Sequence, residues 1–124
     1  MSNLVVSNIS DGTTTVGTGY VVNGSAKAWV NFTTVSSTAV NNSMSFNISS
    51  LTDAGTGDTD VALSNAFSNA SHVDSFNVGD GSNGDQSFLQ TPTSASVIYC
   101  FNYNGNNAAY DSSLCLLSAH GDLA

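Results

Sequence analysis

Apolar and polar residues alternate with a period of two along most of the chain, which is typical of β-strands with one buried face. The apolar members of the clearest runs are Ala26, Ala28, Val30 and Phe32; Met44, Phe46 and Ile48; Val61 and Leu63; and Val97, Tyr99, Phe101 and Tyr103. Clusters of Gly, Asn and Asp separate these runs and favour tight turns. The pattern predicts an all-β chain with a single antiparallel β-sandwich or jelly-roll-like domain.

The end of the chain predicts a hairpin with its turn near Asn107 and Ala108. In that register Cys100 lies opposite Cys115, and both faces of the two strands are mostly apolar. A hairpin of this kind would be buried on both sides. Helical character is confined to residues 62–70, where we expect no more than one short turn of helix.

The first 20 residues differ from the rest because Val5, Ile9 and Val16 are too widely spaced to fill a core. We expect residues 1–20 to form an extended N-terminal arm that completes a sheet or reaches a neighbour. An ordinary first pair of strands is the alternative. The β-sandwich module then spans residues 21–124, and its length suits one hydrophobic core.

Charge excludes several partners. The chain has nine acidic residues against one basic residue, Lys27, and a formal net charge of -8. Nucleic-acid binding draws on Lys and Arg to displace counterions from phosphates, so we expect no nucleic-acid partner, and no docking on anionic lipid for the same reason. No apolar run approaches the roughly 20 residues of a membrane-spanning helix.

The first six residues lack the cationic and continuous apolar parts of a signal peptide. We therefore expect synthesis in a cytoplasm. Cys100 and Cys115 are then predicted to be two buried thiols, although a cross-strand disulfide is the geometric alternative.

The sequence contains only weak matches to motifs for nucleotide binding, calcium binding and catalysis. Residues 79–84 match a dinucleotide-binding glycine pattern, but no room follows for the required helix, so we expect a surface loop. Residues 80–91 lack the ligand spacing of a calcium loop. His72 and His120 are the only histidines, and no serine lies in a nucleophile elbow. We predict no catalytic residue, no cofactor and no metal ion.

One run carries a resemblance to a known family. Residues 26–32 read Ala-Lys-Ala-Trp-Val-Asn-Phe, which resembles the signature of a β-rich module in tail fibres and related virion proteins of cyanophages and other marine phages. Residues 45–58 and the ending 120–124 are similar to the same module, so the resemblance covers roughly residues 11–124. It implies a non-enzymatic virion protein, trimeric and without a cofactor.

The signature also makes physical sense as an interface. Trp29 faces away from Val30 and Phe32, so its strand can bury one face in its own core and the other against a partner. Lys27 is expected to pair with an aspartate or a backbone carbonyl at that interface. The predicted oligomer or partner interface comprises Lys27, Trp29, Val5, Ile9, Val16 and Tyr20.

A chain that begins with Met1 and offers at most a 20-residue arm favours a capsid decoration (cement) protein on the virion surface, made in the bacterial host cytoplasm. We expect a homotrimer that bridges copies of the major capsid protein, its arm adding a strand to a neighbour. The alternative is a tail fibre tip, joined to tail proteins, that recognises a host surface receptor through loops such as residues 79–85.

Overall fold

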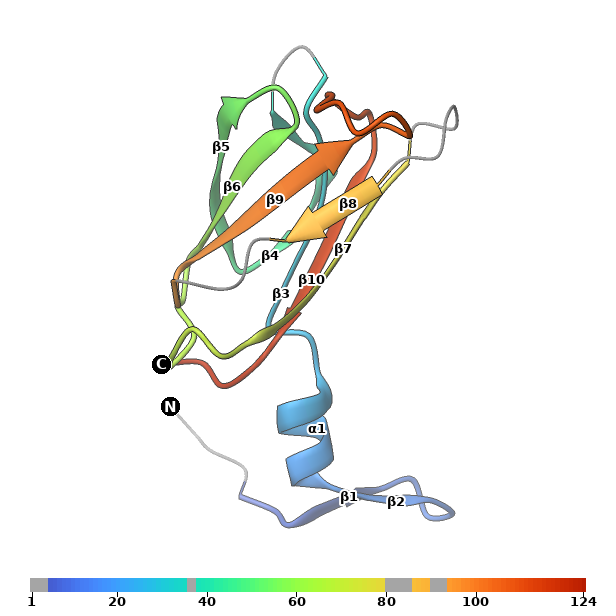
Figure 1. The fold of residues 1–124 in the computed structure, drawn as a ribbon. Helices are drawn as coiled ribbons and strands as arrows, with labels where there is room; N and C mark the ends of the chain where they lie inside the picture. Colours follow the sequence, from blue (N-terminus) through green and yellow to red (C-terminus); the bar gives the residue numbers. More distant parts are fainter. Residues whose placement is uncertain (1–4, 36–37, 80–85, 90–93) are drawn as a thin grey trace.

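The computed structural model describes residues 5–35, 38–79, 86–89 and 94–124. Two four-stranded antiparallel sheets pack face to face (Figure 1). The first contains, in spatial order, β4 (Ala39–Phe46), β3 (Ala28–Thr33), β10 (Cys115–His120) and β7 (Val73–Val78). The second contains β5 (Ile48–Gly55), β6 (Asp58–Leu63), β9 (Val97–Tyr103) and β8 (Gln86–Leu89). The predicted all-β, antiparallel sandwich is confirmed.

The core lies between the two sheets and follows the alternation along the central strands. Its buried apolar members are Ala28, Val30, Phe32, Val61, Leu63, Phe67, Phe76, Ile98, Cys100, Cys115, Leu117 and Ala119. Phe32 and Phe76 stack with their ring centroids 6.1 Å apart. Because these side chains come from both sheets, their removal from water holds the two layers together.

The chain passes from the first sheet to the second at Asn47, which has a positive φ of 59°. Its side chain accepts the N–H of Asn65 at 2.7 Å and donates to the carbonyl of Asn65 at 3.0 Å. The corner divides the predicted run of Met44, Phe46 and Ile48 between two strands. Met44 and Phe46 are therefore exposed on the first sheet, whereas Ile48 packs against the core.

The predicted C-terminal hairpin is wrong. β9 pairs with β6 and β8, whereas β10 pairs with β3 and β7, so the connection between β9 and β10 crosses from one sheet to the other. Each of the two strands buries only one face. Cys100 and Cys115 are both buried and both free, which confirms the prediction of two buried thiols.

The predicted extended arm is also wrong in its conformation. Residues 8–24 form a separate hairpin, β1 (Asn8–Ser10) and β2 (Thr15–Gly17), followed by the helix α1 (Thr18–Gly24). A pair of strands, the alternative considered from sequence, is present, but it joins neither sheet of the sandwich. Residues 62–70, for which at most one short turn of helix was predicted, contain no helix: β6 continues to Leu63, and Phe67 forms a bridge with Leu123.

Candidate functional site

Residues 5–24, which we call the stalk, protrude from one end of the sandwich (Figure 1). No residue of α1 is buried. The exposed apolar side chains of the stalk are Val5, Val6, Ile9, Val16, Tyr20, Val21 and Val22. A hairpin with three-residue strands and a helix of seven residues are each marginal in water on their own. The stalk therefore exposes a group of apolar side chains that its own short elements do not bury.

The turn of the stalk hairpin is fixed by Asp11. Its carboxylate accepts the backbone N–H groups of Thr13 at 2.9 Å and Thr14 at 2.7 Å. These hydrogen bonds favour the ionised form and lower the pKa of Asp11. The hairpin therefore has a defined turn although its apolar side chains have no core of their own.

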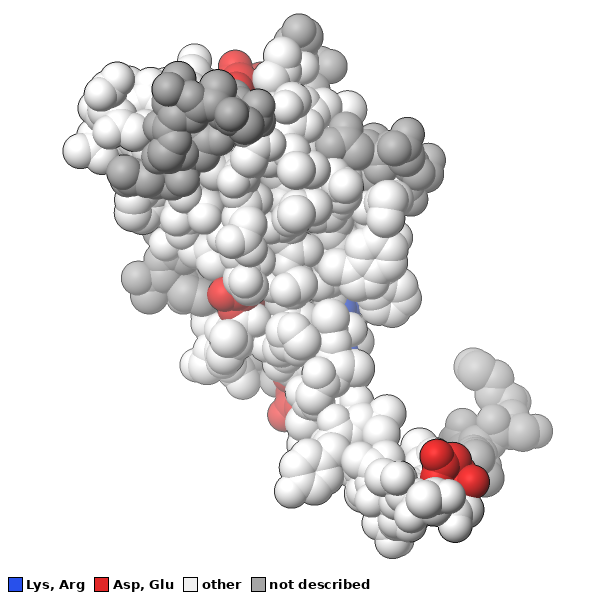
Figure 2. Space-filling view, turned by 90° about the vertical axis from the view of Figure 1, so that its right-hand side faces the viewer, with Lys and Arg blue, Asp and Glu red and all other residues white. Residues whose placement is uncertain are grey.

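Lys27 joins the stalk to the sandwich. Its Nζ donates to the carbonyl oxygen of Val22 and, at 2.6 Å, to the hydroxyl of Ser25. Val22 lies in the last turn of α1, so the ammonium group sits at the negative end of the helix dipole. The backbone N–H of Lys27 donates to the carbonyl of Ala119 at 2.8 Å. Figure 2 shows this single basic side chain where the stalk meets the sandwich.

A backbone carbonyl was one of the two partners predicted for Lys27, and the structure places that carbonyl in the same chain. Trp29 projects from the outer face of β3 and is 39% exposed, as the alternation predicted. Phe46 of β4 and Ser118 of β10 flank it in register. The remaining predicted interface residues, Val5, Ile9, Val16 and Tyr20, all lie on the stalk.

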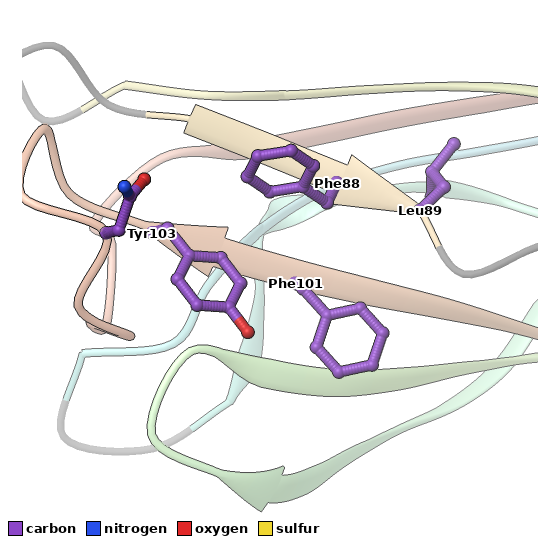
Figure 3. Close-up of a pocket in the computed structure, with 5 residues that line it drawn as sticks. Phe88, Leu89, Phe101 and Tyr103 are labelled. Atoms are coloured by element: carbon purple, nitrogen blue, oxygen red, sulfur yellow. The ribbon is translucent and has the colours of Figure 1, made fainter.

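A second candidate site lies on the outer face of the other sheet. Phe88, Leu89, Phe101, Tyr103 and Asn107 line a groove of about 470 Å³, which we call the aromatic groove (Figure 3). β9 turns its alternate residues, the side chains of Ile98, Cys100 and Asn102, into the core. The stripe formed by Val97, Tyr99, Phe101 and Tyr103 therefore faces outward, contrary to the prediction that both faces are buried.

The aromatic groove is built from neighbouring strands. Phe88 of β8 lies opposite Phe101 of β9, and its ring meets that of Tyr103 edge to face, with centroids 5.5 Å apart and planes at 85°. Asn107 follows β9 in a turn with a φ of 58°, and its N–H donates to the carbonyl of Asn104 at 2.9 Å. Leu89, the last residue of β8, packs against the core and also lines the groove.

Carboxylates border these rings. Asp58 and Asp60 of β6 lie opposite Phe101 and Tyr99 of β9, on the same outer face. Burial raises the pKa of Asp58, and the negative charges of Asp60 and Asp53 raise it further. Lys27 is the only Lys or Arg of the chain, and it lies at the stalk junction. The aromatic groove thus lies beside a strand that carries two carboxylates, of which that of Asp58 is opposite the groove residue Phe101.

Hydrogen-bond contacts and a stacked ring hold the side chain of His72 in place. Its Nδ1 lies 2.9 Å from Asp74 Oδ1, its Nε2 lies 3.1 Å from the carbonyl oxygen of Ser94, and its ring stacks on Phe67. Burial raises the pKa of Asp74, while the hydrogen bond and charge of His72 act in the opposite direction. Both ring nitrogens have partners, so His72 has no free nitrogen with which to activate a serine.

Further predictions from the sequence concern a receptor-binding loop, metal ions and membrane-spanning helices. The loop predicted to contact a receptor, residues 79–85, lies outside the described residues from position 80 onward. Within the described ranges, no group of three His, Cys, Asp or Glu side chains is placed to hold a metal ion. Nor does the described part of the chain contain a helix with the length and apolarity needed to span a membrane.

Comparisons with protein-family models, with curated proteins and with solved structures found no match to this chain.

Proposed function

We propose that this chain is a non-enzymatic structural protein of the bacteriophage virion surface, a homotrimeric capsid decoration (cement) protein that bridges copies of the major capsid protein. The observation that supports assembly into a trimer is the stalk, whose apolar side chains are exposed in the described part of the chain. The virion setting is supported by the resemblance of residues 26–32 to the phage module.

The two stretches that resemble the phage module lie where this fold tolerates few residues. Ala28 is fully buried between the sheets, and Lys27 beside it fixes the end of α1. In the second stretch Gly57 has a φ of 70°, and a Cβ there would lie 2.5 Å from the carbonyl oxygen of Asn102. These contacts give a structural reason for Ala28, Lys27 and Gly57 in this chain.

Assembly in this proposal uses apolar and uncharged polar contacts. Charged residues make up 8% of the chain, and most of the described surface in Figure 2 is uncharged. Contacts of this kind are little affected by salt, which screens only charges. Three stalks packed about a common axis would bury their valines and Ile9 against one another. The protein would be made in the host cytoplasm and then added to the particle.

The stalk interface can be tested with a double substitution. Ile9 and Val16 lie opposite each other in the hairpin, so Ile9→Asp with Val16→Asp places charge on one face of the stalk. We expect the trimer seen by analytical ultracentrifugation to become a monomer with an intact sandwich. Val73→Asp is the control, because Val73 is 70% exposed on β7. A monomeric native protein, or a double variant that remains trimeric, contradicts the proposal.

The location on the virion is tested by the number of copies per particle, measured by quantitative mass spectrometry against the major capsid protein. Hundreds of copies are expected of a decoration protein. A few to a few dozen copies would reject decoration and support the second candidate function, recognition of a host surface receptor by a tail fibre tip. The aromatic groove is the observation that favours this second candidate.

A further inference from the structure

The outer face of the second sheet carries side chains that stalk assembly does not use. Phe88, Phe101 and Tyr103 lie on neighbouring strands and line the aromatic groove (Figure 3). Its volume of about 470 Å³ lies within the roughly 300–1,000 Å³ typical of small-molecule sites. Phe88 is 49% exposed, although aromatic rings gain more than most side chains from burial. The groove therefore offers flat apolar surface to a ligand.

The polar groups around the groove define what the ligand must carry. The Tyr103 hydroxyl and the Asn107 amide can each donate and accept hydrogen bonds. Asp58 lies directly across from Phe101, a position that brings Cβ atoms to about 4.5–5.5 Å. Burial and the negative charges of Asp60 and Asp53 raise the pKa of Asp58. The hydroxyl groups of a ligand lying on Phe101 could donate hydrogen bonds to this carboxylate.

Charge narrows the class of ligand. An anionic ligand is disfavoured, because the net charge is -8 and Lys27 lies at the stalk junction. A quaternary ammonium ligand needs several ring faces that converge on one point. Phe88 and Tyr103 instead meet edge to face and pack on each other. A neutral ligand with apolar C–H faces and many hydroxyl groups fits both the rings and the acceptors.

We propose that the aromatic groove is a binding site for a neutral saccharide, a sugar unit of an uncharged surface polysaccharide. The C–H face of the sugar ring lies on the aromatic side chains, and its hydroxyl groups donate to the Asp58 carboxylate and to the Asn107 side-chain carbonyl. This site does not depend on the stalk, so it is compatible with a place on the head or on the tail.

Affinity gel electrophoresis tests the proposal, since a protein with a net charge of -8 migrates readily at neutral pH. The native protein is run through gels that contain dextran, a β-glucan, a galactan or a mannan, and through a gel with alginate as the acidic polymer. We expect retardation by at least one neutral polysaccharide. Phe88→Ala and Tyr103→Ala should each weaken it roughly tenfold, since each removes one stacking surface.

Phe46→Ala is the matched control, because Phe46 is 53% exposed on the opposite sheet, close to the exposure of Phe88. It should leave retardation unchanged. Asp58→Asn should weaken binding without unfolding the protein. The stalk double variant should keep the affinity per protomer by calorimetry, so failure of the groove and failure of assembly are seen separately. The proposal is overturned if no neutral polysaccharide retards the protein, if alginate retards it more, or if Phe46→Ala has the same effect as Phe88→Ala.

Discussion

The sandwich and the stalk use the same kinds of residues but bury them differently. In the sandwich Phe32, Val61 and Cys100 are at most 1% exposed, whereas the stalk has no buried residue among those described. Valine and isoleucine occur in both regions. The difference teaches that apolar content does not tell whether a side chain is buried within its own chain or left exposed. The sandwich should therefore be stable by itself, and the stalk only in an assembly.

Substituting one glycine in each region should give the largest difference in stability between sandwich and stalk. In the sandwich, Gly57→Ala forces a Cβ to within 2.5 Å of Asn102 O at a φ of 70°, and we expect a loss of roughly 3 kcal/mol or more. In the stalk, Gly19→Ala meets nothing within 4 Å and should favour the helix by about 0.5–1 kcal/mol. Denaturation followed by the fluorescence of Trp29 measures the first, and circular dichroism the second. Equal loss in both variants would contradict the comparison.

The thiols of the sandwich predict sensitivity to alkaline pH. Burial raises the pKa of Cys115 to about 11 and raises that of Cys100 well above its usual value. Because the folded state holds these protons more tightly than the unfolded state, their contribution is complete below about pH 9. For Cys115 it is lost as the pH rises through about 11, and we expect a decrease of about 2–3 kcal/mol.

Urea denaturation at pH 8 and pH 11 measures this decrease. The Cys100→Ala, Cys115→Ala double variant starts from lower stability because it leaves cavities, but its stability should change less between the two pH values. A native protein and a double variant with the same pH dependence would show that the thiols are not responsible. No such titration is expected of the stalk, whose described residues include no cysteine.

The core of the sandwich also contains a defect that can be repaired. Thr59 Oγ1 is buried and, within the described ranges, has no hydrogen-bond partner. Thr59→Val replaces the hydroxyl by a methyl group of similar shape, and we expect a gain of about 1 kcal/mol in the free energy of unfolding.

Thr34→Val is the control for this gain. The Thr34 hydroxyl accepts the N–H of Ser112 at 2.8 Å and donates to its carbonyl at 3.3 Å. Its removal leaves both groups without these bonds and should destabilise the sandwich. If calorimetry finds that both substitutions lower the melting temperature, the assignment of Thr59 as unsatisfied is wrong.

The smallest effect is expected at the junction of the two regions. Lys27→Met removes the ammonium group from the carbonyl of Val22 and should weaken α1 by about 0.5–1 kcal/mol. Amide hydrogen exchange should accelerate in residues 18–24 and stay unchanged in β9. Acceleration across both regions would mean that Lys27 supports the sandwich rather than the stalk.

The alternation of apolar and polar residues predicted the core strands well. Ala28, Val30 and Phe32, for example, lie on the same face of β3, and that face is buried against the other sheet. The alternation failed on β9, where the outward residues Tyr99 and Phe101 are more apolar than the inward residue Asn102. Periodicity separates two faces but does not tell which face the second sheet covers. The pairing of β9 with β10 failed for the same reason, since a turn signal does not distinguish a hairpin from a crossing between sheets.

The candidate sites were only partly visible in the sequence. The exposed stalk residues were identified because Val5, Ile9 and Val16 fit no strand pattern of the core. The helix α1 was missed because Gly19 and the β-branched Val21 and Val22 are poor helix formers. The aromatic groove was missed because it unites residues of β8, β9 and the turn at Asn107, which only the fold brings together. The partner of Lys27 lies five positions earlier in the chain, a spacing without a sequence signature.

The attachment of the stalk to β3 has a mechanical consequence. β3 is a central strand with β4 on one side and β10 on the other, and the chain enters it directly from α1 through Lys27. Ladder hydrogen bonds run perpendicular to the strands. A pull along the stalk is therefore directed along β3, so that it shears the bonds to both neighbours together instead of opening them one after another. A sandwich tethered in this way can bear load through its tether without unravelling from its edge.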